Sequence, residues 1–201
     1  CMQKAAAGDV DAAVIMGGNL WAATPDTAFS SRAMANIGFK LFLTTTLNQG
    51  HVHGVGEGEM MILPVTARDE EWEPTTQESM FNFVRLSDGG IRRIETVRPE
   101  SWILGQLGQR MLPQSPIDFA AFSGHAKLRD AIAAIVPGME QLADIDVAKR
   151  EFHIRNRVLH APSFGTADGK AHFVVTPVPE QAPGRLMLAS MRSEGQFNSI
   201  I

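Results

Sequence analysis

Residues 12–46 read AAVIMGGNLWAATPDTAFSSRAMANIGFKLFLTTT, and this stretch decides the fold. Its opening, residues 12–17, is a short apolar run that ends at a glycine pair, which is typical of a buried parallel strand. Its last eight residues, 39–46, are rich in aromatic and β-branched side chains and predict a second strand. Between them, Thr24-Pro25-Asp26 supplies helix-start signals, with Pro25 expected at the first helical position, and Gly38 ends the helix. Strand, helix and strand predict a βαβ unit with a parallel sheet and a right-handed crossover.

The next part of the chain alternates loops with short strands. Residues 47–58 carry four glycines and predict a loop, and residues 60–65, MMILPV, predict a short buried strand. The acidic stretch 67–78 predicts a solvated loop. Residues 80–86 and 91–97 flank the sequence Ser-Asp-Gly-Gly, and Asp-Gly between alternating apolar residues predicts a β-hairpin.

Helices follow, and the chain then returns to strands. Residues 99–111 have apolar side chains at helical spacing, and residues 123–138 predict a stronger helix that begins at a serine cap and ends at Pro-Gly. Residues 139–148 predict a weaker helix. Residues 172–178, preceded by Ala-Asp-Gly, predict a second hairpin, and residues 186–191 begin a new strand after a proline-rich linker.

These elements predict an α/β fold. We expect a Rossmann-like parallel sheet with flanking helices plus a β-hairpin, ending in the first strand of a β-rich carboxyl-terminal domain. The composition suits a folded core, with 44% hydrophobic residues and a net charge of −4. We place the first domain at residues 1–180, and the linker with the start of the second domain at 181–201.

Charge and cysteine content exclude several classes of function. A pI near 5.9 with scattered basic residues gives no footprint for nucleic acid, and the longest apolar runs are too short for a membrane segment. Cys1 is the only cysteine, whereas an iron–sulfur cluster needs about four. No signal peptide is evident, so we expect a cytoplasmic protein. Both ends look cut, so we expect a longer gene product.

Two glycines after the first predicted strand form the first candidate site. Gly17, Gly18 and Asn19 stand at the carboxyl end of that strand, where open α/β sheets bind their ligands. A glycine pair lets the backbone approach a nucleotide closely, although the spacing lacks the full GxGxxG pattern. The alternative is a tight strand-to-helix turn with no ligand.

Two further clusters carry polar side chains. His51 and His53, with Glu57 and Glu59 nearby, suggest a metal site, but this glycine-rich loop has no fixed geometry and we assign no metal to it. The second cluster follows the last predicted strand. An arginine there offers a planar fork for phosphate, and its neighbours donate and accept hydrogen bonds at a heterocycle edge. The alternative for the second cluster is an ordinary polar turn; its residues are Arg192, Ser193, Gln196 and Asn198.

Six segments, in this order, resemble one enzyme superfamily: DAAVIMGGNLWAATPD, TTLNQGH, EMMILP, RPESWILGQLGQRM, ADGKAHF and LMLASMRSEGQFNS. They are similar to molybdopterin-dependent oxidoreductases, in the formate dehydrogenase alpha-subunit-like branch. Such enzymes hold molybdenum or tungsten by two molybdopterin guanine dinucleotides. The resemblance spans nearly the whole chain, and the order of the segments carries more weight than any single motif.

The resemblance implies roles for particular residues. It implies that Gly17, Gly18 and Asn19 line one dinucleotide, and that Leu47 and Asn48 lie at its guanosine end. It also implies that the segment from Ser190 opens the carboxyl-terminal cofactor-binding domain. The metal-ligating residue and the cysteines of a 4Fe-4S cluster belong to parts of the family that this chain lacks. The site residues implied as cofactor contacts there are Arg192, Ser193, Gln196 and Asn198.

The sequence therefore predicts part of a molybdenum oxidoreductase that acts on formate or another small oxyanion. Its expected partners are the dinucleotide cofactor and the remaining domains of the parent chain. The isolated chain has no catalytic residue in this interpretation, and we expect it to be inactive and free of cofactor. An alternative is a non-redox nucleotide-binding or regulatory α/β module, such as the central domain of a thiamine-diphosphate enzyme. A third is a pure interaction domain.

Overall fold

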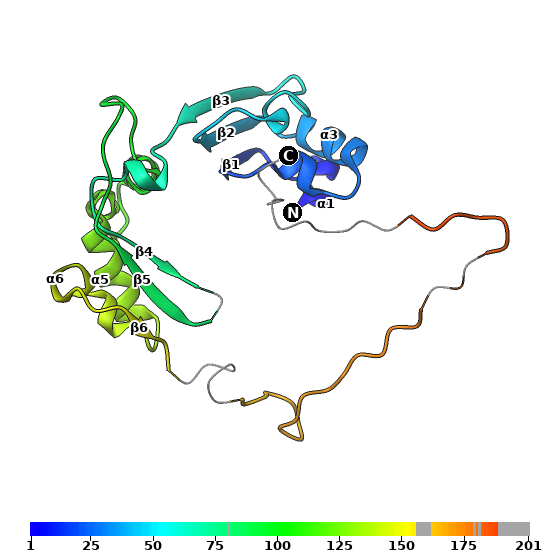
Figure 1. Cartoon of the computed structure of the whole chain (residues 1–201). Helices are drawn as coiled ribbons and strands as arrows, with labels where there is room; N and C mark the ends of the chain where they lie inside the picture. The colour runs from blue at the N-terminus through cyan, green and yellow to red at the C-terminus, as the bar shows by residue number, and fades with distance from the viewer. Residues whose placement is uncertain (80, 156–161, 179, 181, 189–201) are drawn as a thin grey trace.

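The fold is α/β, as the sequence predicts. A computed structural model describes residues 1–79, 81–155, 162–178, 180 and 182–188 (Figure 1). The helices are α1 (Met2–Ala7), α2 (Leu20–Ala23), α3 (Thr27–Ala35), α4 (Glu100–Met111), α5 (His125–Ile135) and α6 (Ile145–Ala148), with short 3-10 helices η1 (Gln49–His51), η2 (Arg68–Glu70), η3 (Ala120–Ser123) and η4 (Glu140–Leu142). The strands are β1 (Ala12–Met16), β2 (Phe39–Thr44), β3 (Glu59–Pro64), β4 (Thr75–Glu78), β5 (Phe83–Ser87) and β6 (Phe152–His153).

Three of these strands form a parallel sheet in the order β1-β2-β3. In its register, Val14 pairs with Leu41 and Leu41 pairs with Met61. The parallel pairing of β1 and β2 across α2 and α3 confirms the predicted βαβ unit. The strands predicted at residues 12–17 and 60–65 both form, but the prediction that they are buried is wrong, because they lie at the edges of this small sheet. Val14 is 47% exposed and Met61 is 48% exposed.

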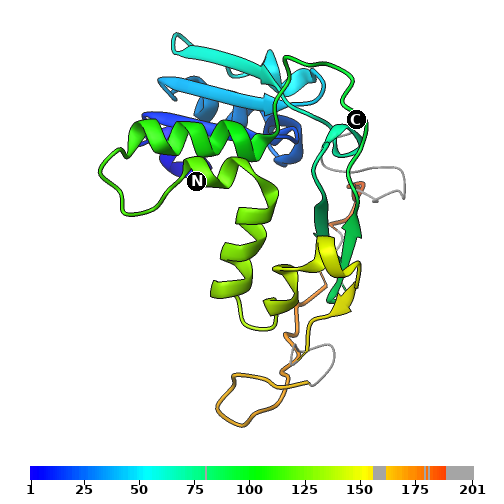
Figure 2. The same ribbon diagram turned by 90° about the vertical axis from the view of Figure 1, so that its left-hand side faces the viewer.

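Helices cover both faces of the sheet. On one face, Ala5 of α1 and Ala33 of α3 form a cluster with Ile37, and Ala13 of β1 packs against it. On the other face, Leu41 and Leu43 of β2 form a cluster with Val65, against which the apolar residues of α4 pack. Figure 2 shows α4 in front of the sheet and the amino-terminal helices behind it. The sheet is therefore flanked by helices, as the sequence predicts.

The starts of two helices differ from their predicted positions by one or two residues. The cap of α3 is Asp26, whose Oδ1 accepts a hydrogen bond from Phe29 N at 2.8 Å, so Pro25 precedes the cap and is not the first helical residue. The predicted cap of α5, Ser123, lies in η3 and does not cap it. Instead Glu73, far away in the sequence, accepts from His125 N at 2.7 Å. A distant carboxylate is invisible to a local capping pattern.

The hairpin differs from its prediction in its strands and its turn. β5 pairs antiparallel with β4, and with β6 on its other side, whereas residues 91–97 form no strand. At the turn between β4 and β5, Asn82 N donates to Ser79 O at 3.1 Å and Asn82 adopts a φ of 58°. The segment after Asp88 is held elsewhere, because Ile91 N donates to Asp69 O at 3.1 Å. The acidic stretch expected as a loop thus contains β4.

The remaining strand predictions have different outcomes. Residues 172–178 are exposed and form no strand in the described part of that segment, so the second predicted hairpin is wrong there. The apolar side chains of this segment are exposed to solvent, and Phe173 is 99% exposed. Residues 186–188 are described without a strand, and the rest of that predicted strand lies outside the described residues. The boundary between residues 1–180 and 181–201 stays a prediction.

Among the described residues, no helix is both long enough and apolar enough to cross a bilayer. The predicted cytoplasmic location stays a prediction.

Lys40 of β2 is a fully buried lysine at the carboxyl end of α3. Its Nζ donates to Ile37 O at 2.8 Å and to Met34 O at 3.2 Å, so it satisfies carbonyls at the end of α3. A cation at a helix carboxyl terminus also interacts favourably with the helix dipole. Burial lowers the pKa of Lys40 below its ordinary value of 10.5, because removal from water disfavours the charged form.

This burial predicts a pH dependence of stability. Between the lowered pKa of folded Lys40 and 10.5, the unfolded chain binds more protons than the folded chain, so the free energy of unfolding should rise with pH in that window. We expect Lys40→Met to remove this rise. Urea unfolding of both proteins at several values from about pH 8 to about pH 10 measures it. An identical slope in the two proteins would show that Lys40 does not contribute it.

Candidate functional site

The candidate site lies at the carboxyl ends of β1 and β2. The turn from Gly17 to Asn19 follows β1, and Leu47 and Asn48 follow β2. The two segments meet directly, because Asn48 Nδ2 donates to Gly18 O at 3.1 Å. The structure therefore brings together five of the predicted site residues at the edge where parallel sheets bind ligands.

The glycine pair has a backbone that favours glycine. Gly17 adopts a φ of 57° and Gly18 a φ of 68°, and two consecutive residues in the left-handed region are strained for any side chain with a Cβ. A Cβ built at either position would meet no described atom within 4 Å. The surface above the pair is therefore open, and backbone strain, not crowding, favours glycine here.

Asn19 has a structural role in this turn. It is 6% exposed, and its Oδ1 accepts from Ala22 N at 3.0 Å, which caps α2. Gly50 packs closely on the same oxygen, since a Cβ at Gly50 would collide with it. The side-chain oxygen of Asn19 therefore fixes the angle between the turn and α2.

A capping box holds Asn48 in place. Gly50 N donates to Asn48 Oδ1 at 2.9 Å, and Asn48 N donates to His51 Nδ1 at 2.9 Å. His51 is 4% exposed and lies edge-on to Phe42 at 5.0 Å. Burial lowers the pKa of His51, because removal from water disfavours the charged imidazolium. A neutral His51 thus accepts the bond that orients Asn48.

The two histidines considered as metal ligands point to different partners. His53 stacks on Trp21, with ring centroids 4.0 Å apart, and Trp21 Nε1 donates to Ser31 Oγ at 2.7 Å. His51 faces Asn48 and Phe42, as described above. Within the described residues, no group of three or more His, Cys, Asp or Glu side chains is placed to hold a metal ion.

Close to this site lie contacts that the sequence did not predict. The Trp21–His53 stack and the buried His51 are both tertiary features of a loop that the sequence showed only as glycine-rich. The alternation of His51 and His53 was the one available signal, and it suggested metal binding. Leu47, by contrast, is 74% exposed beside Asn48.

The other predicted site residues lie outside the described residues; they are Arg192, Ser193, Gln196 and Asn198.

The chain is similar to parts of larger proteins, some of which are named as oxidoreductases. No protein-family model matches the chain. Uncharacterized oxidoreductase Mb2924c of Mycobacterium bovis is 33% identical over 198 residues, which is 92% of this chain and 25% of that protein. Uncharacterized oxidoreductase Rv2900c of Mycobacterium tuberculosis matches with the same figures. Protein YdeP of Escherichia coli K12 is 26% identical over 216 aligned positions, which is 100% of this chain and 28% of that protein.

The chain therefore spans about a quarter of the length of the curated relatives that it matches. It is similar to one part of larger proteins, and two of the three described above are named as oxidoreductases.

Proposed function

We propose that this chain forms one dinucleotide cradle of a larger oxidoreductase that carries molybdenum or tungsten on two molybdopterin guanine dinucleotides. The observation that carries the proposal is the meeting of the Gly17-Gly18 turn with Asn48 at the carboxyl ends of β1 and β2. The oxidoreductase names of two relatives favour this redox function over the non-redox nucleotide-binding module.

The residues present fit a dinucleotide. Above Gly17 and Gly18 no described atom would touch a Cβ, so a phosphate or sugar can approach the backbone. Asn48 is a fixed amide at the next strand end, as recognition of a base or sugar edge requires. Leu47 offers an exposed apolar side chain beside it. The open turn and the oriented amide together support the guanosine-end assignment.

The division of chemistry follows from this arrangement. When bound, the metal cofactor supplies the oxidation and reduction, with formate or another small oxyanion as the proposed substrate class. This chain binds and orients the cofactor. In the proposal, Arg192 pairs with a phosphate or pterin group, because a planar guanidinium matches phosphate oxygens in a buried site. Further polar contacts come from Ser193, Gln196 and Asn198.

Substitution of Gly18 tests the cradle. We expect Gly18→Val in the full-length protein to reduce bound cofactor about tenfold or more, because a β-branched side chain at a φ of 68° distorts the turn and fills the open surface above it. Metal per chain, measured by mass spectrometry on purified folded protein, reports the loss.

Gly169→Val is the matched control for this change. Gly169 has the same φ of 68° and equally open surroundings, but it lies in an exposed turn remote in sequence from the strand ends. We expect it to leave the cofactor content unchanged. Equal cofactor content in Gly18→Val and wild type would remove the glycine pair from the site.

A further inference from the structure

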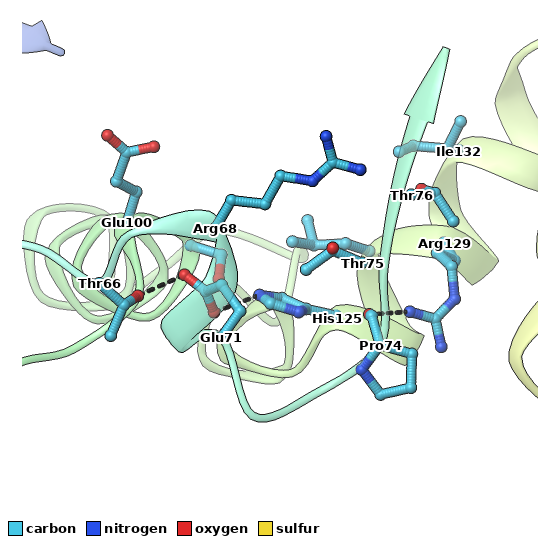
Figure 3. A pocket seen from close by; sticks show the side chains of 12 residues that line it. Thr66, Arg68, Glu71, Pro74, Thr75, Thr76, Glu100, His125, Arg129 and Ile132 are labelled. Carbon is cyan, nitrogen blue, oxygen red and sulfur yellow. Dashed lines mark hydrogen bonds and ion pairs between the residues drawn. The ribbon is translucent and has the colours of Figure 1, made fainter. Parts of the chain in front are cut away.

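A cavity of about 360 Å³, separate from the site at the ends of β1 and β2, lies among four segments of the chain (Figure 3). We call it the Glu71 cavity. Its walls come from the segment after β3, from β4, from the first turn of α4 and from α5. We call the candidate site at the carboxyl ends of β1 and β2 the strand-end site. None of its residues lines the Glu71 cavity. Its volume is in the range of small-molecule sites.

Buried polar atoms without a partner gather around this cavity. In the described part of the chain, six buried side-chain nitrogen or oxygen atoms have no hydrogen-bond partner, and five belong to residues that line the Glu71 cavity. Buried polar groups in folded proteins are normally satisfied, so this concentration points to a missing partner. Four of them are Thr75 Oγ1, Ser101 Oγ, His125 Nδ1 and Arg129 Nε, and the fifth is Glu71 Oε2, which lies 3.5 Å from His125 Nε2 as an ion pair but makes no hydrogen bond.

One wall of the cavity is acidic. Glu71 accepts a hydrogen bond from Thr66 and lies 3.5 Å from His125 Nε2. Glu100 projects from the start of α4 on the same side in Figure 3. Burial raises the pKa of Glu100, and repulsion from Glu71 raises it further. A cationic group between these carboxylates would relieve that repulsion.

The opposite wall is basic. Arg129 is 3% exposed, donates to Pro74 O at 2.7 Å and pairs with Asp146, which leaves its Nε without a described partner. Arg68 extends across the top of the cavity toward this wall (Figure 3). Leu128 and Ile132, from the same helix as Arg129, add apolar side chains to the lining.

We propose that the Glu71 cavity binds a small zwitterion of the free amino acid class. The ammonium group would lie at Glu71 and Glu100, and the carboxylate would lie toward Arg68 and Arg129. The ligand's own donors and acceptors would reach the unpartnered hydroxyls with small rotations of those side chains. A metal ion does not fit, since no described trio of ligating side chains converges here. This inference does not depend on the proposed cofactor.

Calorimetric titration of the full-length protein with each of the common L-amino acids tests the proposal. We expect at least one of them to bind, and its amine-only and carboxylate-only analogues to bind about tenfold or more weakly, because each analogue satisfies only one wall. Glycerol is the neutral probe. Binding of none of the amino acids, or equally strong binding of glycerol or of a one-charge analogue, would overturn the proposal.

Two charge-removing variants locate the binding. We expect Glu100→Gln and Arg68→Gln each to weaken amino acid binding about tenfold to a hundredfold. Glu57→Gln removes a carboxylate from the exposed loop before β3 and should leave the affinity unchanged. If neither of the first two variants weakens binding, the ligand lies elsewhere and the assignment of this cavity is wrong. Cofactor content, measured in the same samples, reports separately on the strand-end site.

Discussion

Arg129→Ala is expected to lower the free energy of unfolding by about 3–5 kcal/mol, the range found when one partner of a buried ion pair is removed. Arg129 is 3% exposed, lies 2.5 Å from Asp146 and donates to the backbone oxygen of Pro74. Without it, the Asp146 carboxylate, 22% exposed, and the Pro74 carbonyl both lose their partner. Urea unfolding followed by circular dichroism measures the change.

Arg150→Ala is the control for this prediction. Arg150 is an exposed arginine close in sequence to β6, and substitutions at such surface positions usually change stability by less than about 0.5 kcal/mol. If Arg129→Ala costs no more than Arg150→Ala, the ion pair does not join α5 to α6 in the way described.

Gly56→Val is expected to lower the free energy of unfolding by about 3 kcal/mol or more. Gly56 has a φ of 66°, and a Cβ there would lie 2.8 Å from the Cα of Ala35 at the end of α3. The obstacle is backbone, so no side-chain rotation relieves it, and the left-handed conformation adds strain for a β-branched residue. The loop would have to leave α3. Thermal unfolding reports the loss.

Gly165→Val is the matched substitution for comparison. A Cβ at Gly165 would meet no described atom within 4 Å, and its φ is not in the left-handed region. We expect a melting temperature close to that of the wild type. A similar melting temperature for Gly56→Val would mean that the loop is not packed on α3 as described.

The sequence predicted the βαβ unit because all its signals are local. The apolar run before Gly17, the helix-start sequence Thr24-Pro25-Asp26 and the aromatic stretch at Phe39 each report on a few neighbouring residues. The parallel pairing of β1 with β2 then follows from the short helical connection between them. The contact between Gly18 and Asn48 is a finding of the structure, since neighbouring parallel strands end at one edge of the sheet.

The hairpin prediction failed because tertiary packing overrides the local Asp-Gly turn signal. Asp88-Gly89-Gly90 is a good turn sequence, but a Cβ at Gly90 would collide with the backbone of Asp69, so this segment lies against η2 and does not reverse the chain. Asn82, which forms the actual turn, carries no glycine signal.

The Glu71 cavity was not predictable for a related reason. His125 and Glu71 are far apart in the sequence, and no motif spacing connects them. Their pairing follows from the packing of α5 against the segment before β4, which Glu73 reinforces by capping α5. Sites assembled from distant segments in this way require coordinates.

The metal and guanine nucleotide content of the full-length protein, purified from a host that makes the molybdenum cofactor, tests the proposed cradle most directly. We expect about one molybdenum or tungsten atom and about two guanine nucleotides per chain, with both contents falling together in Gly18→Val. Folded wild-type protein that contains neither the metal nor the nucleotide would contradict it.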